Sequence, residues 1–182
     1  MSDYRRWKIS GGTFFFTIVT HNRKRLFDSD TARQFLRESF YEVTSRHPFA
    51  IPAIVLLPDH LHMLMCLPAR DAEFSVRIRQ IKTLFTKRWA QVEDTKRQRS
   101  MSRQSRGEHN VWQRRFYEHM VRDEEDFQRC ADYIHVNPLK HGLVRRVIDW
   151  PWSSFHRWLT DGHYEAGWGD GEWFGDEFQK YE

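Results

Sequence analysis

The sequence contains little cysteine and lacks long apolar runs. Its two cysteines, Cys66 and Cys130, lie within apolar patterns, where a cysteine is usually a small buried hydrophobe of a reducing compartment. We therefore assign them no chemistry. No apolar run approaches the roughly 20 residues of a membrane span, and the mean hydropathy is −0.77. Residues 1–12 also lack the apolar centre of a signal peptide. We expect a cytoplasmic protein with no membrane partner.

Aromatic residues, in contrast, are abundant. Phe, Trp and Tyr make up 15% of the 182 residues, which argues against disorder because burying so much ring surface offsets the entropy lost on folding. This length suits one domain with a sizeable core and leaves little room for a second. We expect one domain over residues 1–160, followed by an acidic aromatic tail at residues 161–182.

Charge is unevenly distributed along the chain. From Arg77 to Arg115, twelve Lys or Arg residues stand against three acids, a net charge of +9, whereas residues 161–182 hold seven acids and one lysine, a net charge of −6. Residues 95–106 contain no acid. A solvated charged helix is the alternative explanation, but a basic central region in an aromatic-rich chain favours a polyanionic partner, namely nucleic acid.

Hydrophobic periodicity divides the chain into alternating strands and helices. Residues 95–110 lose all periodicity, which predicts a mobile basic loop. We expect the third helix to end at Asn137, because Pro138 disfavours helical conformation in the residue before it. The predicted strands are residues 13–21, 49–58, 60–68 and 111–121, and the predicted helices are residues 30–47, 74–89 and 122–137.

The order of these elements predicts an α+β, ferredoxin-like fold. Its first six elements form a split βαβ unit with an antiparallel sheet and with helices on one face. The two strands at residues 13–21 and 60–68 would lie at the centre of the sheet. The helix at residues 122–137, which carries Tyr133, is an addition to this unit.

The stretch LLPDHLHMLMCLP (residues 56–68) places two histidines at the head of a predicted central strand. Because side chains alternate along a strand, His60 and His62 point to one face, about 7 Å apart, and can close on one metal ion. In the alternative, one histidine caps the turn at Asp59 and the other is a half-buried core residue. A pair that opens a central strand, in a chain with a basic region, favours the metal interpretation.

The third predicted helix offers further ligands. Tyr133 and Asn137 are four residues apart and therefore neighbours on one helical face, at the flank of an apolar stripe, where we expect them at the edge of the packed surface. An amide oxygen with two imidazoles leaves open positions on Mg²⁺ or Mn²⁺ that suit phosphate oxygens. Spacing alone leaves Tyr133 open as either a nucleophile or a core-edge tyrosine.

At this point the sequence resembles the REP-associated tyrosine transposases, a branch of the single-tyrosine HUH transposases. The similarity covers residues 4 to about 160 and is weakest at residues 93–110. The stretches that carry it are YRRWKISGGTFFFTI (4–18), LLPDHLHML (56–64), WQRRFYEHMVRDEEDF (112–127), DYIHVNPLKHGLV (132–144) and WPWSSFHR (150–157).

The resemblance implies a metal-dependent endonuclease and strand transferase that acts on single-stranded DNA. His60 and His62 match the family's metal-binding histidines, and Asn137 stands where the third ligand is expected. Tyr133 matches the nucleophile, which attacks the scissile phosphate, remains joined to the 5′ end and leaves a free 3′-hydroxyl. The implied substrates are repetitive extragenic palindromes (REP elements), hairpins flanked by a tetranucleotide, and the implied oligomeric state is a monomer.

Other residues are candidates for DNA contact or an auxiliary role. Glu118 and His119 are candidates for proton transfer or metal geometry, with strand-edge polar residues as the alternative. Tyr117 ranks second as nucleophile, because no ligand lies one helical turn beyond it. The candidate DNA contacts, which combine charge with stacking surface, are Tyr4, Arg5, Arg6, Arg79, Lys82, Lys87, Arg114 and Arg115.

Two other functions fit part of the sequence. A non-catalytic ferredoxin-like module that binds DNA or RNA hairpins would not need Tyr133. A metallohydrolase that uses water is disfavoured, because the His-x-His-x-Asp pattern of zinc hydrolases fails at Leu64.

Overall fold

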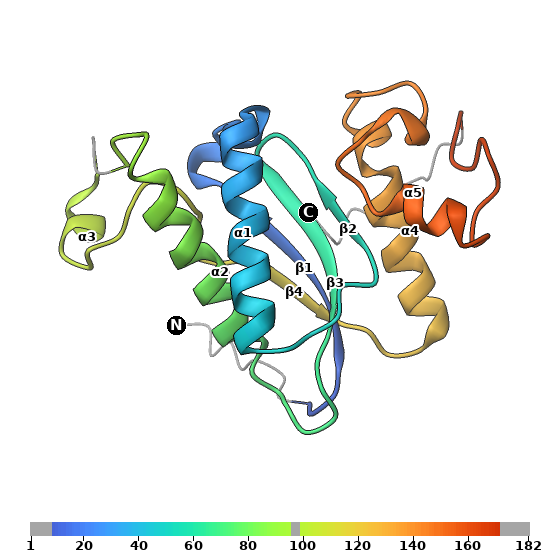
Figure 1. Ribbon diagram of the computed structural model, residues 1–182, viewed down its shortest axis with the longest axis horizontal. Helices are drawn as coiled ribbons and strands as arrows, with labels where there is room; N and C mark the ends of the chain where they lie inside the picture. Colours follow the sequence, from blue (N-terminus) through green and yellow to red (C-terminus); the bar gives the residue numbers. More distant parts are fainter. Residues whose placement is uncertain (1–8, 96–98, 172–182) are drawn as a thin grey trace.

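The computed structural model describes residues 9–95 and 99–171 and is built on a four-stranded antiparallel sheet (Figure 1). The strand order is β2-β3-β1-β4. The central strands are β1 (Thr13–Val19) and β3 (His60–Cys66), as the ferredoxin-like prediction requires. The edges are β2 (Ile54–Leu56) and β4 (Tyr117–Met120), both shorter than predicted.

Helices cover both faces of this sheet (Figure 1). No helix within residues 9–95 and 99–171 combines the length and the apolar character needed to cross a bilayer. The α-helices are α1 (Asp30–Arg46), α2 (Phe74–Trp89), α3 (Met101–Gln104), α4 (Glu124–Lys140) and α5 (Phe155–Thr160), with single 3₁₀ turns at residues 21–23, 26–28 and 147–149.

The two central strands are buried on both faces, and each face has its own core. On β1, Phe14 and Phe16 point toward α1 and α2, while Phe15 points toward α4. On β3, Leu61 and Met63 join the α1 and α2 core, as the alternation predicted. The histidines of β3 therefore lie on the opposite face, beneath α4.

The helix predicted at residues 122–137 is α4, which begins two residues later than predicted, at Glu124, and also ends later than predicted. Asp123 caps it by accepting a hydrogen bond from the backbone N–H of Asp126 at 2.8 Å. The prediction that it ends at Asn137 was wrong, because it continues through Pro138 to Lys140. Proline has no backbone N–H, so Pro138 removes one hydrogen bond, but only in the last turn of the helix. The ring of Pro138 is buried, and its packing outweighs the preference of Asn137 for a non-helical conformation before proline. Gly142, at φ +64°, follows the last turn.

The segment between α2 and β4 differs most from the prediction. Residues 111–116 form no strand: Trp112 contributes only an isolated bridge to Thr20. The predicted loop at residues 95–110 contains α3, and Arg103 is buried at 8% exposure. Its guanidinium donates to the backbone oxygens of His109 and Trp112. Polar side-chain to backbone bonds hold this segment, which is why apolar periodicity did not reveal it.

The cap of α4 provides a test of local stability. Replacing Asp123 by Ala removes the acceptor for the Asp126 N–H and should lower the free energy of unfolding by about 1 kcal/mol. Asp123→Ser should retain most of that stability. The matched control is Glu124→Ala, in the same turn, which should cost less than about 0.5 kcal/mol. Urea denaturation measures both, and an equal loss in the two alanine variants would contradict the assignment of the cap.

Candidate active site

His60 and His62 lie side by side at the start of β3. Their ring centroids are 4.8 Å apart, with the ring planes at 84° to one another. The two residues are 4% and 1% exposed. A pair of imidazoles this close, on one face of a rigid central strand, can direct two nitrogen atoms at one ion.

A neighbour at Nδ1 orients each imidazole. His60 Nδ1 lies 2.5 Å from Asp59 Oδ1, and His62 Nδ1 lies 2.8 Å from Thr17 Oγ1. Because a carboxylate only accepts, His60 donates from Nδ1 and keeps its lone pair at Nε2. The hydroxyl of Thr17 can accept from His62 in the same way. Arg23 in turn pairs with Asp59 at 3.4 Å. The contact between His60 and Asp59 fits both the metal interpretation and its structural alternative.

Helix α4 brings its C-terminal half against this pair. The Tyr133 ring centroid is 5.0 Å from that of His62, and the His141 ring centroid is 5.2 Å from that of His60. Tyr133, Asn137 and His141 are spaced four residues apart and so share one helical face. From this spacing we infer that Asn137, between the two residues that make ring contacts, faces the histidine pair.

The polar atoms at this position fit a divalent metal ion. His62 Nε2 and both amide atoms of Asn137 are buried and make no hydrogen bond within residues 9–95 and 99–171. A satisfied core histidine would not leave Nε2 in this state. Burial is the largest cause that lowers the pKa of His62 well below its usual range, and the neighbouring basic side chains add to the effect. The imidazole is therefore neutral, which is the form that binds metals.

Tyr133 and Asn137 are fully buried, so the prediction that they lie at the edge of the packed surface was wrong. Both are 0% exposed. Tyr133 packs directly on the sheet, with its ring centroid 5.8 Å from that of Phe15. A second surface of α4, around His135, is covered by Phe155 and Trp158. The solvent edge of the site is instead the end of α4, where the exposed Lys140 places its Nζ atom 5.2 Å from the Tyr133 ring centroid.

Comparison with known proteins gives the family. Residues 9–137 match the model described as "Transposase IS200 like". The chain is 41% identical, over 168 residues, to a REP-associated tyrosine transposase of Escherichia coli, with 92% of this chain and 91% of that one covered. It is 43% identical, over 169 residues, to a candidate REP-associated tyrosine transposase of Haemophilus influenzae, with 93% and 94% covered. The chain belongs to the REP-associated tyrosine transposases of the IS200-like family.

The same family appears among solved structures. A REP-associated tyrosine transposase bound to a REP hairpin is 40% identical to this chain, with a TM-score of 0.76 and 96% of each chain covered. The predicted fold class and family are therefore confirmed. Tyrosine transposases of this HUH type nick and join DNA and use a divalent metal ion.

The other residues that the sequence suggested for the active site lie on both faces of the sheet. Glu118 pairs in register with Phe16, so it faces α2, away from the histidine pair. His119 faces α4, but its Nε2 atom lies 2.8 Å from Asp126 Oδ2. Tyr117 shares the α4 face with His119.

Sequence analysis missed four residues of the site. Lys140 and His141 could have been found, because His141 continues the spacing of four from Tyr133 and Asn137. Thr17 could not, since its position beside His62 depends on the register of β1 against β3. Asp59 was considered only as part of a turn.

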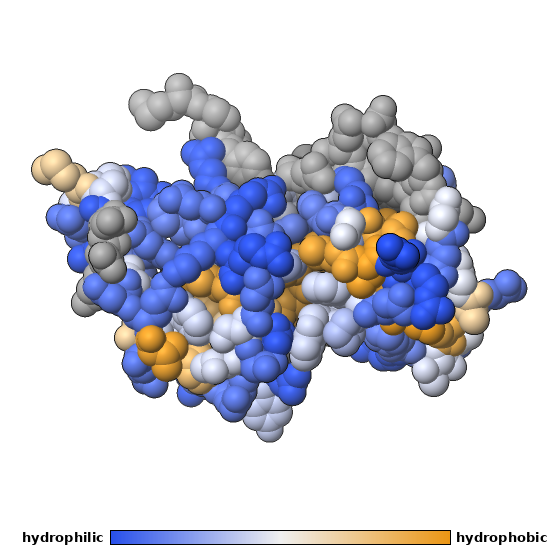
Figure 2. Space-filling view, turned by 90° about the horizontal axis from the view of Figure 1, so that it is seen from above, coloured by the Kyte–Doolittle hydropathy of each residue, from blue (hydrophilic) through white to orange (hydrophobic). Residues whose placement is uncertain are grey.

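A basic groove of about 930 Å³ lies on the other side of the sheet, between α2 and the segment that leads to β4. Seen from above, the surface at this end of the transposase (left) is largely hydrophilic (Figure 2). Arg115 is exposed beside the groove but does not line it. The predicted DNA contacts Tyr4, Arg5 and Arg6 lie outside the described residues. The basic side chains that line the groove are Arg79, Lys82, Lys87, Arg103, Arg106 and Arg114.

The hydroxyl of Thr17 provides a test of the metal site of the transposase. Thr17→Val removes the acceptor that orients His62, so Mn²⁺ affinity measured by calorimetry should fall about 10- to 100-fold. Thr13→Val is the matched control, because Thr13 lies on the same strand and contacts Cys66 Sγ at 3.1 Å. Equal Mn²⁺ affinity in Thr17→Val and the parent protein would show that this contact does not serve the metal.

Proposed function

We propose that this transposase cleaves single-stranded DNA at REP hairpins through a covalent 5′-phosphotyrosine intermediate, with Tyr133 as the nucleophile. The observation that carries the proposal is the ring of Tyr133 at 5.0 Å from His62, on a helix that also directs Asn137 at the histidine pair. The hairpin substrate is supported by the solved relative, which is bound to a REP hairpin.

His60, His62 and Asn137 are the residues that would hold the metal ion. Two imidazoles and an amide oxygen suit Mn²⁺ or Mg²⁺ and leave positions for phosphate oxygens. When bound, the ion would polarise the scissile phosphodiester and so make a phenol, a weak nucleophile in water, sufficient for attack.

The covalent step belongs to Tyr133. Its hydroxyl loses a proton as the oxygen forms a bond to phosphorus, the bond from phosphorus to the 3′ oxygen breaks, and that oxygen takes up a proton. Attack by a 3′-hydroxyl on the phosphotyrosine reverses the sequence and rejoins the strand. The exposed cation of Lys140 stands at the solvent edge of the site, where it favours the approach of a phosphate.

All four residues that we assign to the site come from one chain. His60 and His62 come from β3, and Tyr133 and Asn137 come from α4 of the same molecule. We therefore propose that the protein acts as a monomer.

We assign the basic groove to the DNA backbone. Arginine and lysine side chains along α2 contact phosphates, which fixes the position of the nucleic acid without reading its sequence. Because the groove and the histidine pair lie on opposite faces of the sheet, a hairpin held in the groove would have to pass its single-stranded flank around the sheet edge to Tyr133.

Trapping the intermediate tests the nucleophile. A labelled REP hairpin with Mn²⁺ should give a protein–DNA adduct that survives denaturation, and Tyr133→Phe should lose the adduct while keeping hairpin affinity within about threefold, because one hydroxyl is removed. Tyr117→Phe, the rival, should still form it. An adduct with Tyr133→Phe would disprove the assignment, and cleaved product without any adduct would favour a hydrolase. Binding without cleavage in the parent protein would favour the non-catalytic module.

Salt dependence tests the groove. The double variant Arg79→Ala/Lys87→Ala should bind the hairpin more weakly, and the slope of log K against log salt should fall by roughly 2, about one for each lost phosphate contact. The matched control is Arg37→Ala/Arg70→Ala, two exposed arginines that do not line the groove. The same change in slope for both double variants would show that the groove has no special role.

A further inference from the structure

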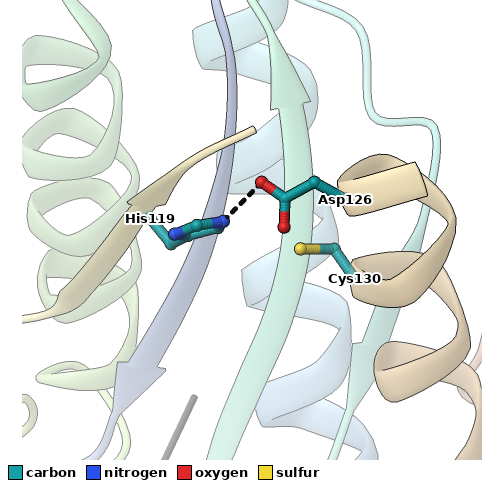
Figure 3. Close-up of side chains that lie close together, drawn as sticks. All are labelled: His119, Asp126 and Cys130. Atoms are coloured by element: carbon teal, nitrogen blue, oxygen red, sulfur yellow. Dashed lines mark hydrogen bonds and ion pairs between the residues drawn. The ribbon is translucent and has the colours of Figure 1, made fainter. Parts of the chain in front are cut away.

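A second group of metal-binding side chains lies between β4 and α4. His119 comes from β4, and Asp126 and Cys130 stand one turn apart on α4 (Figure 3). One nitrogen, one oxygen and one sulfur atom from these three residues all lie within 4.8 Å of one another. Asp126 and Cys130 are 0% exposed, while 16% of the His119 side chain is exposed, which leaves an approach from solvent.

One oxygen of this cluster points inward without a hydrogen bond. Asp126 Oδ2 accepts from His119 at 2.8 Å and from the backbone N–H of Arg122 at 3.1 Å. Asp126 Oδ1 is buried, makes no hydrogen bond within the described ranges, and is directed toward the sulfur of Cys130 (Figure 3). Its nearest ion pair is with Arg129 at 3.6 Å, which is longer than a hydrogen bond.

The cluster is separate from the histidine pair of β3. Phe15 stands between them: its ring contacts His62 at 5.6 Å and Tyr133 at 5.8 Å between centroids, and its register partner on β4 is His119. The donor sets also differ, because a thiol is present here and absent from the other site. Thiolate selects ions of the zinc class over Mg²⁺ and Mn²⁺.

We propose that His119, Asp126 and Cys130 bind a transition metal ion of the zinc class, which links β4 to the N-terminal half of α4. Binding replaces the hydrogen bond between His119 and Asp126, moves the imidazole proton from Nε2 to Nδ1, and releases the thiol proton to solvent. The cations nearest Asp126, Arg122 and Arg129, are 64% and 36% exposed, so solvent screens their repulsion of the ion.

Cobalt provides the probe, because a thiolate bound to Co²⁺ absorbs in the near ultraviolet and imidazoles and carboxylates do not. The full chain, freed of metal by a chelator, should develop this band on addition of Co²⁺, and Zn²⁺ should remove it. The His60→Ala/His62→Ala variant should keep the band, which separates this site from the other one. A parent protein that binds Co²⁺ without the band would overturn the proposal.

Cysteine variants locate the ligand. Cys130→Ser should lose the band and bind Zn²⁺ at least about tenfold more weakly. Cys66→Ser is the matched control and should keep both properties, because Cys66 lies at the end of β3, beside Thr13. In the His60→Ala/His62→Ala background, which removes the other metal site, zinc should raise the melting temperature with Cys130 or with Cys66→Ser present, and should not raise it when Cys130→Ser is added. A band that follows Cys66 instead of Cys130 would also overturn the proposal.

Discussion

The packing of α4 on the sheet face that carries His60 and His62 is the constraint on which the candidate active site depends. A strand alone presents two imidazoles to solvent, and a helix alone presents a phenol and an amide. Only the docked pair brings these groups to one position. Apolar residues on the same face, Phe15 and Leu64, drive this docking, because each would be exposed without the helix. The docking of α4 therefore both completes the core on this face and sets the geometry of the site.

A polar site within an apolar interface is costly unless its groups are held and paired. Here both central strands hold the imidazoles in place. Thr17 on β1 contacts His62, and Asp59, just before β3, contacts His60. Arg23, which pairs with Asp59, adopts a left-handed backbone at φ 50°, as does Asn22 at φ 54°. Non-glycine residues in this conformation are strained and gather at functional sites. One of the two left-handed residues in the turn after β1 is thus the arginine that pairs with the carboxylate beside His60.

The alternation of side chains along the strands was enough to predict the sheet and its two faces. Alternation along LLPDHLHMLMCLP placed His60 and His62 opposite Leu61 and Met63, and spacing along α2 placed its apolar face. The burial of Tyr133 was not predictable in this way, because its ring packs against Phe15 and His62 of the sheet, a contact that the spacing along α4 alone does not show. Neither was the segment around Arg103, whose hydrogen bonds to backbone oxygens leave no periodic trace.

The central claim is that docking of α4 places Tyr133 beside a metal held by His60 and His62. Fluorine NMR of the chain labelled with fluorotyrosine tests it directly, because paramagnetic Mn²⁺ broadens only signals from nearby nuclei. The resonance assigned to Tyr133 by its loss in Tyr133→Phe should broaden beyond detection at one equivalent of Mn²⁺, while that of Tyr41, 79% exposed on α1, stays sharp. The broadening should vanish in His62→Ala. A sharp Tyr133 signal in protein shown by calorimetry to hold Mn²⁺ at the histidine pair would contradict the account.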